Sequence, residues 1–155
     1  MNERVVEILV FIMNQIRGNK ANLSKLDLIS RDLLSKGYSQ NEISSAFSWL
    51  FEKIRNNFEE ILTNTEESHE FSFRILHDLE TMIISPQAFG YLLQLKELGI
   101  FDDLDIEQAI ERAMLLGTGT IDSEEMKAIA AYILAQQSSG GNGSYFVENN
   151  SPLVH

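Results

Sequence analysis

The sequence predicts an all-α protein, built as a compact bundle of about six to seven helices in two helix-turn-helix-like subdomains. Two observations support this fold class: apolar residues recur at helical spacing through most of the chain, and capping residues precede several of these apolar runs. We place the N-terminal subdomain at residues 1–57 and the C-terminal subdomain at residues 74–137. An acidic connector at residues 58–73 joins them, and a flexible tail follows at residues 138–155.

The first two predicted helices cover residues 5–16 and 23–35. The first is apolar on nearly every side, which is typical of a helix packed by several neighbours. Glu7 interrupts this run, and the run is too short to span a bilayer, so we expect no membrane segment. The second helix has aliphatic residues at helical spacing and ends before Gly37.

The third predicted helix has the clearest start. Ser39 and Glu42 stand three positions apart, which is the spacing of a capping box, and Tyr38 and Ile43 bracket them as a hydrophobic staple. We expect one continuous apolar stripe along this helix, because its apolar residues follow helical spacing without a gap. The residues of this stripe are Ile43, Ala46, Phe47, Leu50, Phe51 and Ile54.

A less regular region opens the C-terminal half. Apolar and polar residues alternate near 71–76, which predicts a short extended segment there. A helix follows from about residue 78 to residue 98, with Glu80 in its first turn, where a carboxylate interacts favourably with the helix dipole. Ser85 and Pro86 interrupt this helix and indicate either a kink or a restart, because proline lacks a backbone donor and serine is a good cap.

Two more helix starts repeat the pattern of the third helix. Asp105 is followed three positions later by Gln108. Asp122 is followed at the same spacing by Glu125, and apolar residues at helical spacing come after both pairs. We therefore expect amphipathic helices to begin at Asp105 and at Asp122.

Charge is distributed unevenly along the chain, whose formal net charge is −11. Residues 1–57 carry eight Lys and Arg against six Asp and Glu, whereas residues 58–155 carry four against seventeen. Nucleic acids and anionic membranes are bound largely through cationic side chains, so this balance of +2 against −13 disfavours both kinds of partner. A protein partner with a basic surface is the easier match.

Several kinds of chemical site have no support in the sequence. There are no cysteines, which excludes disulfides, thiolate metal sites and cysteine nucleophiles and fits a cytoplasmic location. The three histidines, His69, His77 and His155, stand far apart, and none has a metal-ligand spacing. No phosphate-binding loop, nucleophile elbow or dinucleotide fingerprint occurs. We therefore expect no metal, no cofactor and no enzymatic activity.

A helix that ends at glycine, followed by a capped helix, has the outline of a helix-turn-helix and raises the alternative of nucleic-acid binding. In that alternative Gln40 and Asn41 contact the bases. Arg31 and Lys36, on the preceding segment, hold the phosphate backbone. The first turns of the third helix offer no arginine, and Glu42 repels phosphate, so nucleic-acid binding remains the alternative to protein binding.

Trp49 lies off the apolar arc of the third helix, beside Lys53. One interpretation is that it packs against a neighbouring helix or the connector. The other is that Trp49, with Ser45 and Lys53 nearby, forms an aromatic anchor on a partner-binding surface. The sequence therefore favours a non-enzymatic protein-interaction or adaptor factor, with these three residues as partner-binding candidates.

Several segments of the chain resemble the bacterial Smg family. The N-terminal EILVFIMNQI, the capped GYSQNEISSAFSWL and the long RILHDLETMIISPQAFGYLLQLKELGIFD follow the layout of that family in order, and the likeness covers roughly residues 4–136. One departure is His77-Asp78, which stands where many members have a Thr-Pro helix start. The most specific part of the likeness consists of Arg74, Ile75, Glu80, Ala88, Gly90, Tyr91 and Leu92.

The resemblance implies a cytoplasmic, all-helical bacterial protein with no established activity and no family catalytic residues to carry over. Members are often encoded beside DNA-processing genes, which implies a link to that pathway. Neither the partner nor the oligomeric state follows from the resemblance.

Overall fold

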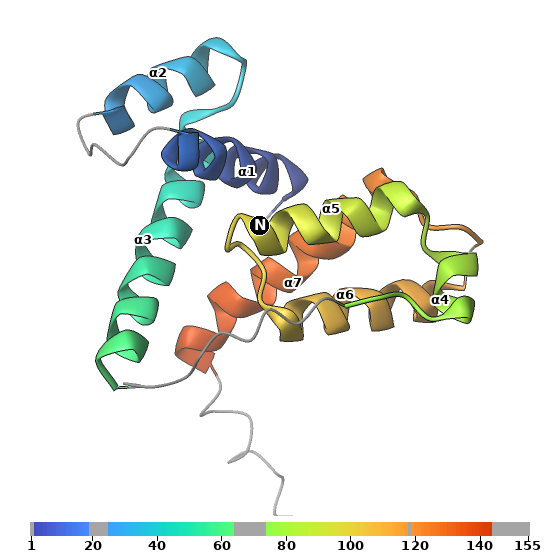
Figure 1. Cartoon of the computed structure of the whole chain (residues 1–155). Coiled ribbons are helices and arrows are strands. Elements are labelled where there is room, and N and C mark those ends of the chain that lie inside the picture. The colour runs from blue at the N-terminus through green and yellow to red at the C-terminus, as the bar shows by residue number, and fades with distance from the viewer. Residues whose placement is uncertain (1, 19–24, 64–73, 118, 144–155) are drawn as a thin grey trace, which may run out of the picture.

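The computed structural model describes residues 2–18, 25–63, 74–117 and 119–143, and it places seven helices there (Figure 1). No strand occurs in these described ranges, so the predicted all-α fold is confirmed. The helices are α1 (Glu3–Gly18), α2 (Leu26–Ser35), α3 (Gln40–Thr63), α4 (Asp78–Ile83), α5 (Pro86–Glu97), α6 (Asp103–Leu116) and α7 (Ser123–Gly143).

α1 connects two parts of the molecule, which we call the arm and the body. The arm consists of α2 and α3, and the body consists of α4 to α7 (Figure 1). α1 packs against α3 of the arm and against α7 of the body, while α7 also packs against α5 and α6. The prediction that the first helix is covered by several neighbours is confirmed, because it buries Val5, Val6, Ile8, Leu9 and Ile12.

The turn between α2 and α3 is tied to α1. The Ser39 N–H donates to Glu42 Oε2 at 2.8 Å and the Glu42 N–H donates to Ser39 Oγ at 3.2 Å, so the predicted capping box is confirmed. The bond from the Ser39 N–H, together with one from the Ser39 hydroxyl to the same carboxylate oxygen, holds the pKa of Glu42 below its ordinary value. Arg4 Nε lies 3.1 Å from Glu42 Oε1, which joins the start of α1 to the start of α3.

The interruption at Ser85 is a restart of the helix. α4 ends at Ile83, and the Ala88 N–H donates to Ser85 Oγ at 3.1 Å to begin α5, with Pro86 in its first turn. Between the two helices the backbone pairs with Ile121, whose carbonyl accepts from the Ser85 N–H at 3.0 Å. A continuous helix would lose this pairing with the segment before α7.

The start of α6 differs from the prediction. The Asp105 N–H donates to Asp102 Oδ1 at 2.8 Å, and the Asp102 N–H donates to Asp105 Oδ2 at 2.9 Å, so the capping box begins at Asp102 and Asp105 occupies its third position. The prediction of a start at Asp105 was wrong by three residues, because the spacing of a capping box occurs twice in succession, from Asp102 to Asp105 and from Asp105 to Gln108. The start at Asp122 is confirmed by reciprocal bonds with Glu125 of 2.8 and 3.0 Å.

The predicted boundaries of the connector and the tail fall inside helices. α3 continues to Thr63 and α7 continues to Gly143, beyond the predicted limits at residues 57 and 137. Residues 64–73 and 144–155, which make up the rest of the connector and tail, lie outside the described residues. Of the extended segment predicted near 71–76, only residues 74–76 are described, and they form no strand. The division into two subdomains stays a prediction.

None of the helices in the described ranges combines the length and the apolar composition needed to cross a bilayer.

Candidate functional site

The surface between α3, α6 and α7 contains a cleft of about 510 Å³. α3 extends away from α1 (Figure 1). Side chains of α3 form one wall of the cleft, and side chains of α6, of the turn before α6 and of α7 form the rest of its lining. Its volume falls in the range of ordinary ligand-binding sites, roughly 300 to 1,000 Å³. The lining residues are Trp49, Glu52, Lys53, Asn56, Asp102, Leu104, Asp105, Gln108, Ile133, Gln136, Gln137 and Ser138.

Trp49 forms an apolar wall of this cleft and is only 7% exposed. The Lys53 ammonium lies 5.1 Å from the centroid of its ring, a cation–π contact. The same ammonium donates to the carbonyl oxygen of Ile100 at 2.9 Å, which links α3 to the turn before α6. Trp49 is therefore held in place by a charged neighbour that is itself anchored to the body.

The apolar stripe predicted on α3 is not covered along its whole length. Phe51 is 52% exposed and Ile54 is 54% exposed, although Ile43 and Leu50 are buried. The buried face of α3, which packs against α1, is rotated toward Trp49. Helical spacing predicts which residues share an arc, but the neighbouring helices decide which part of that arc is buried.

Asp105 lies buried in the cleft lining and is only 4% exposed. Its Oδ1 accepts a hydrogen bond from Gln137 Nε2 at 2.5 Å, while Oδ2 accepts from the Asp102 N–H. Burial raises the pKa of Asp105 above its ordinary value, and the bond from Asp102 acts in the opposite direction. The carboxyl group thereby ties the first turn of α6 to the C-terminal part of α7.

The side chains that line the cleft are mostly carboxyl groups and amides. Three carboxyl groups and one ammonium line it, together with four side-chain amides. Amides both donate and accept hydrogen bonds, which suits a peptide backbone, and an excess of carboxylates favours cationic side chains. Leu104 adds an exposed apolar group, with 65% of its surface accessible.

A second hollow of about 520 Å³ lies beside the first and shares Trp49, Glu52 and Ser138 with it. Ser45 lines this second hollow, and its hydroxyl donates to the carbonyl oxygen of Asn41 at 2.9 Å. Trp49, Ser45 and Lys53, the partner-binding candidates from the sequence, therefore line two adjoining hollows along α3. Their role in binding stays a prediction.

The residues of the nucleic-acid alternative are spread over the arm. Gln40 and Asn41 are exposed in the first turn of α3, and Arg31 is exposed on α2. Lys36 already has two contacts: its ammonium lies 3.8 Å from the centroid of the Phe11 ring and 3.7 Å from Asp32 Oδ2.

Sequence reasoning did not identify Asp105, Gln136 or Gln137 as cleft residues, because the contact between α6 and α7 joins positions 32 residues apart. Within the described ranges, no group of three or more metal-binding side chains is placed to hold an ion. Of the three histidines, His77 precedes α4, while His69 and His155 lie outside the described residues.

Comparisons with known proteins place the chain in a family. A family model described as "Protein of unknown function (DUF494)" matches residues 5–150. The "Protein Smg homolog" of Xylella fastidiosa strain M23 is 28% identical, over 94% of this chain and 90% of that protein. The protein of the same name from Stenotrophomonas maltophilia strain K279a is 25% identical, over 99% of both chains. No solved structure matches. The resemblance to the Smg family is confirmed, and the chain belongs to the DUF494 family of proteins of unknown function.

Proposed function

We propose that this protein is a non-enzymatic, cytoplasmic interaction factor that binds a basic segment of a partner protein in the cleft between α3, α6 and α7. The observation that supports this proposal most strongly is the composition of that cleft. A tryptophan wall, three carboxyl groups and four amides line one hollow. The family resemblance implies a link to DNA processing.

A peptide segment fits this lining better than a compact metabolite. Amides spaced along α6 and α7 suit the repeated donors and acceptors of an extended backbone. Glu52 and Asp102 are exposed carboxylates that a lysine or arginine of the partner would contact, while Leu104 offers an exposed apolar group. The second hollow extends the contact along α3 toward Ser45.

Selection of a random linear peptide library against the purified chain tests this function. We expect the selected peptides to carry lysine or arginine beside an apolar residue. Gln108→Lys places a cation in the cleft and should weaken binding by at least roughly tenfold, which is about 1.4 kcal/mol. Gln87→Lys makes the same change in charge at an exposed site on α5 outside the cleft and should leave binding unchanged.

Two results would count against the proposal. Selected peptides without an excess of cations would contradict the electrostatic part of it, and equal binding by the two lysine variants would place the site elsewhere. The nucleic-acid alternative is tested with fluorescent duplex DNA at low salt, where we expect no binding. Affinity that falls steeply with salt and is lost in Arg31→Glu would favour that alternative.

A further inference from the structure

The cleft and the second hollow adjoin along α3 and form one groove, which we call the α3 groove. It comprises the lining residues of both hollows, and Trp49, Glu52 and Ser138 belong to the two linings at once. A ligand that fills the cleft therefore reaches the edge of the second hollow.

One stripe of α3 runs along the whole α3 groove. Its five residues are exposed, and their i, i+4, i+7, i+11, i+15 spacing places them on one face of the helix: Asn41, Ser45, Ser48, Glu52 and Asn56. A helix rises about 1.5 Å per residue, so the stripe is about 22 Å long. An extended chain covers about 3.3 Å per residue, so about seven residues of a partner would span it.

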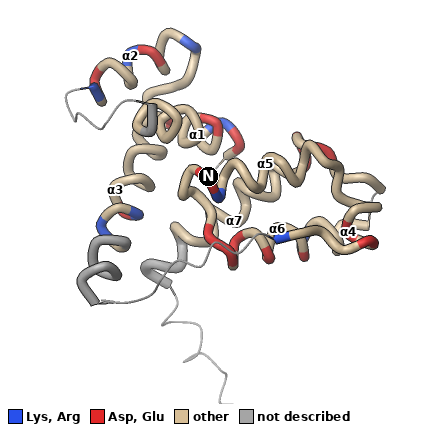
Figure 2. Tube along the Cα trace, viewed as in Figure 1, with Lys and Arg blue, Asp and Glu red and all other residues tan. Residues whose placement is uncertain are grey.

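The two ends of the α3 groove differ in charge. Asp102 and Asp105 line the end toward α6, and Figure 2 shows acidic positions gathered at the start of that helix. The Lys53 ammonium at this end already donates to the carbonyl oxygen of Ile100. Among the described residues that line the second hollow, Glu52 at the boundary carries the charge. The first turns of α3 add the positive end of the helix dipole there, so a cation of the partner is favoured at the α6 end.

Short hydroxyl side chains line the second hollow. Ser44, Ser45 and Ser48 are all exposed there. Their hydroxyl groups both donate and accept hydrogen bonds, and their small size lets the backbone of a partner approach the helix closely. The second hollow therefore suits a stretch of partner chain with small, uncharged side chains.

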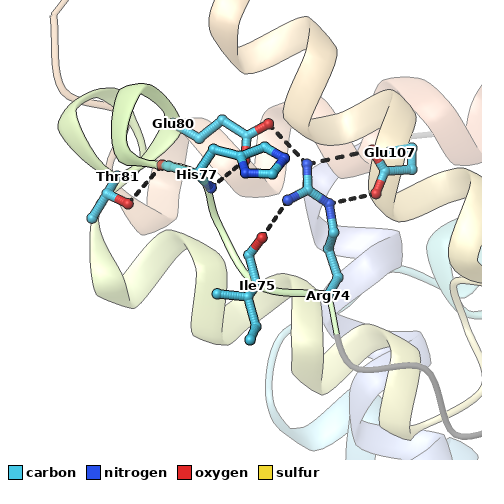
Figure 3. A network of polar contacts seen from close by, with 6 residues as sticks. All are labelled: Arg74, Ile75, His77, Glu80, Thr81 and Glu107. Carbon is cyan, nitrogen blue, oxygen red and sulfur yellow. Dashed lines mark hydrogen bonds and ion pairs between the residues drawn. The ribbon is translucent and has the colours of Figure 1, made fainter.

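A polar network around Arg74 fixes α6, which supplies the acidic end of the α3 groove (Figure 3). Arg74 Nε donates to Glu107 Oε1 on α6 at 2.5 Å, and Arg74 Nη2 donates to Glu80 Oε1 on α4 at 2.8 Å. The same guanidinium donates to the carbonyl oxygen of Ile75. Because α6 is already tied to its neighbours, binding at this end would order little additional backbone.

We propose that the partner segment lies extended along the α3 groove over about seven residues, with its lysine or arginine at the α6 end and small uncharged side chains at the Asn41 end. This inference rests on the proposed function, since it concerns the same partner segment, and adds the length of that segment and the order of its side chains. The length of the exposed stripe on α3 and the difference in charge between the two ends support it.

Stepwise truncation of a selected basic peptide tests the length. Calorimetry on the full wild-type chain measures the affinity as residues are removed from the end far from the cation. We expect no loss of affinity down to about seven residues, and a loss of at least roughly tenfold once about four remain. Full affinity in the peptide of about four residues would overturn the proposed length.

A substitution in the second hollow tests the position of the segment. Ser45→Arg fills that hollow and should weaken binding of the long peptide at least roughly tenfold, but it should not affect the short peptide, which does not reach Ser45. Ser35→Arg is the matched control, because it makes the same change at an exposed serine of α2 that lines neither hollow. Both positions are exposed on helices, so both variants should keep the fold, which circular dichroism checks.

The outcomes separate this inference from the proposed function. Wild-type affinity of Ser45→Arg for the long peptide, together with weaker binding by Gln108→Lys, overturns the inference and leaves the proposed function standing, because the peptide then occupies the cleft alone. Equal weakening of the long and short peptides by Ser45→Arg also overturns it. Wild-type affinity in both variants contradicts both proposals.

The order of side chains is tested on the peptide itself. Lysine introduced at the position farthest from the cation should not tighten binding, because it would lie near the start of α3, away from the acidic end. Tighter binding of this peptide would contradict the proposed order.

Discussion

The arm and the body both contain helices that begin with a capping box, at Ser39 in the arm and at Asp102 and Asp122 in the body, but they bury their apolar faces to different extents. In the body, α5 buries Ala88, Leu92 and Leu95 completely. In the arm, Leu33 is the buried residue of α2, and the outer side of α3 remains exposed at Phe51. Helix formation therefore depends on local sequence in both regions, whereas most of the packing energy resides in the body and in α1.

The largest contrast is expected for apolar side chains in the two regions. Leu95→Ala, in the body, should lower the free energy of unfolding by about 2 to 5 kcal/mol, because it removes a fully buried side chain and leaves a cavity. Phe51→Ala, in the arm, should lower it by less than about 1 kcal/mol, because about half of its surface is already in water. Urea denaturation followed by circular dichroism measures both changes, and equal losses would remove the distinction between arm and body.

The polar network at Arg74 should have an intermediate effect. Arg74→Gln removes the charged partner of Glu80 and should lower the free energy of unfolding by about 1 to 3 kcal/mol at neutral pH. The hydrogen bond from Arg74 holds the pKa of Glu80 below its ordinary value of 4.5. The contribution is therefore present above pH 4.5 and is lost as the pH falls through the lowered pKa.

Denaturation of wild type and Arg74→Gln over a range of pH tests this linkage. The difference between the two chains should shrink as the solution becomes more acidic. A difference that stays constant through the acid range would show that Arg74 acts through packing of its side chain and not through the ionised form of Glu80.

The smallest expected effect concerns the helix caps. Ser39→Ala and Asp122→Ala should each lower the free energy of unfolding by about 1 kcal/mol, because each removes the acceptor of one capping bond. The two substitutions should destabilise different regions of the molecule. Hydrogen exchange should accelerate in α3 alone for Ser39→Ala, and throughout the body for Asp122→Ala. Uniform acceleration in both variants would indicate that the arm and the body unfold together.

The sequence predicted the helices well because their signals are local. The capping pairs at Ser39 and Asp122 stand within one turn of the bonds that they form. The sequence alone did not decide between a kink and a restart at Ser85. The restart depends on backbone pairing with Ile121, which lies far along the chain. The start of α6 was misplaced because the pairs from Asp102 and from Asp105 satisfy the same spacing rule.

The candidate site was predicted only in part, because it combines three helices that are distant in the sequence. Trp49, Ser45 and Lys53 were identified on one helix, but their opposite wall, with Asp105 and Gln137, depends on how α6 and α7 approach α3. Periodicity placed Phe51 on the apolar stripe and Trp49 outside it, whereas Trp49 is buried and Phe51 is half exposed. Periodicity does not reveal on which side a neighbouring helix packs. Long-range packing is the information that a single sequence lacks.

Trp49 allows the most direct test of the proposed peptide-binding cleft, because it is the single tryptophan of the chain and lines that cleft. A selected basic peptide without tryptophan should change the emission of Trp49 in a saturable way, with the same dissociation constant that calorimetry gives. Gln108→Lys should shift both measurements to higher peptide concentration, and Gln87→Lys should shift neither. Calorimetric binding with unchanged Trp49 emission would contradict the account, because the peptide would then bind outside the cleft.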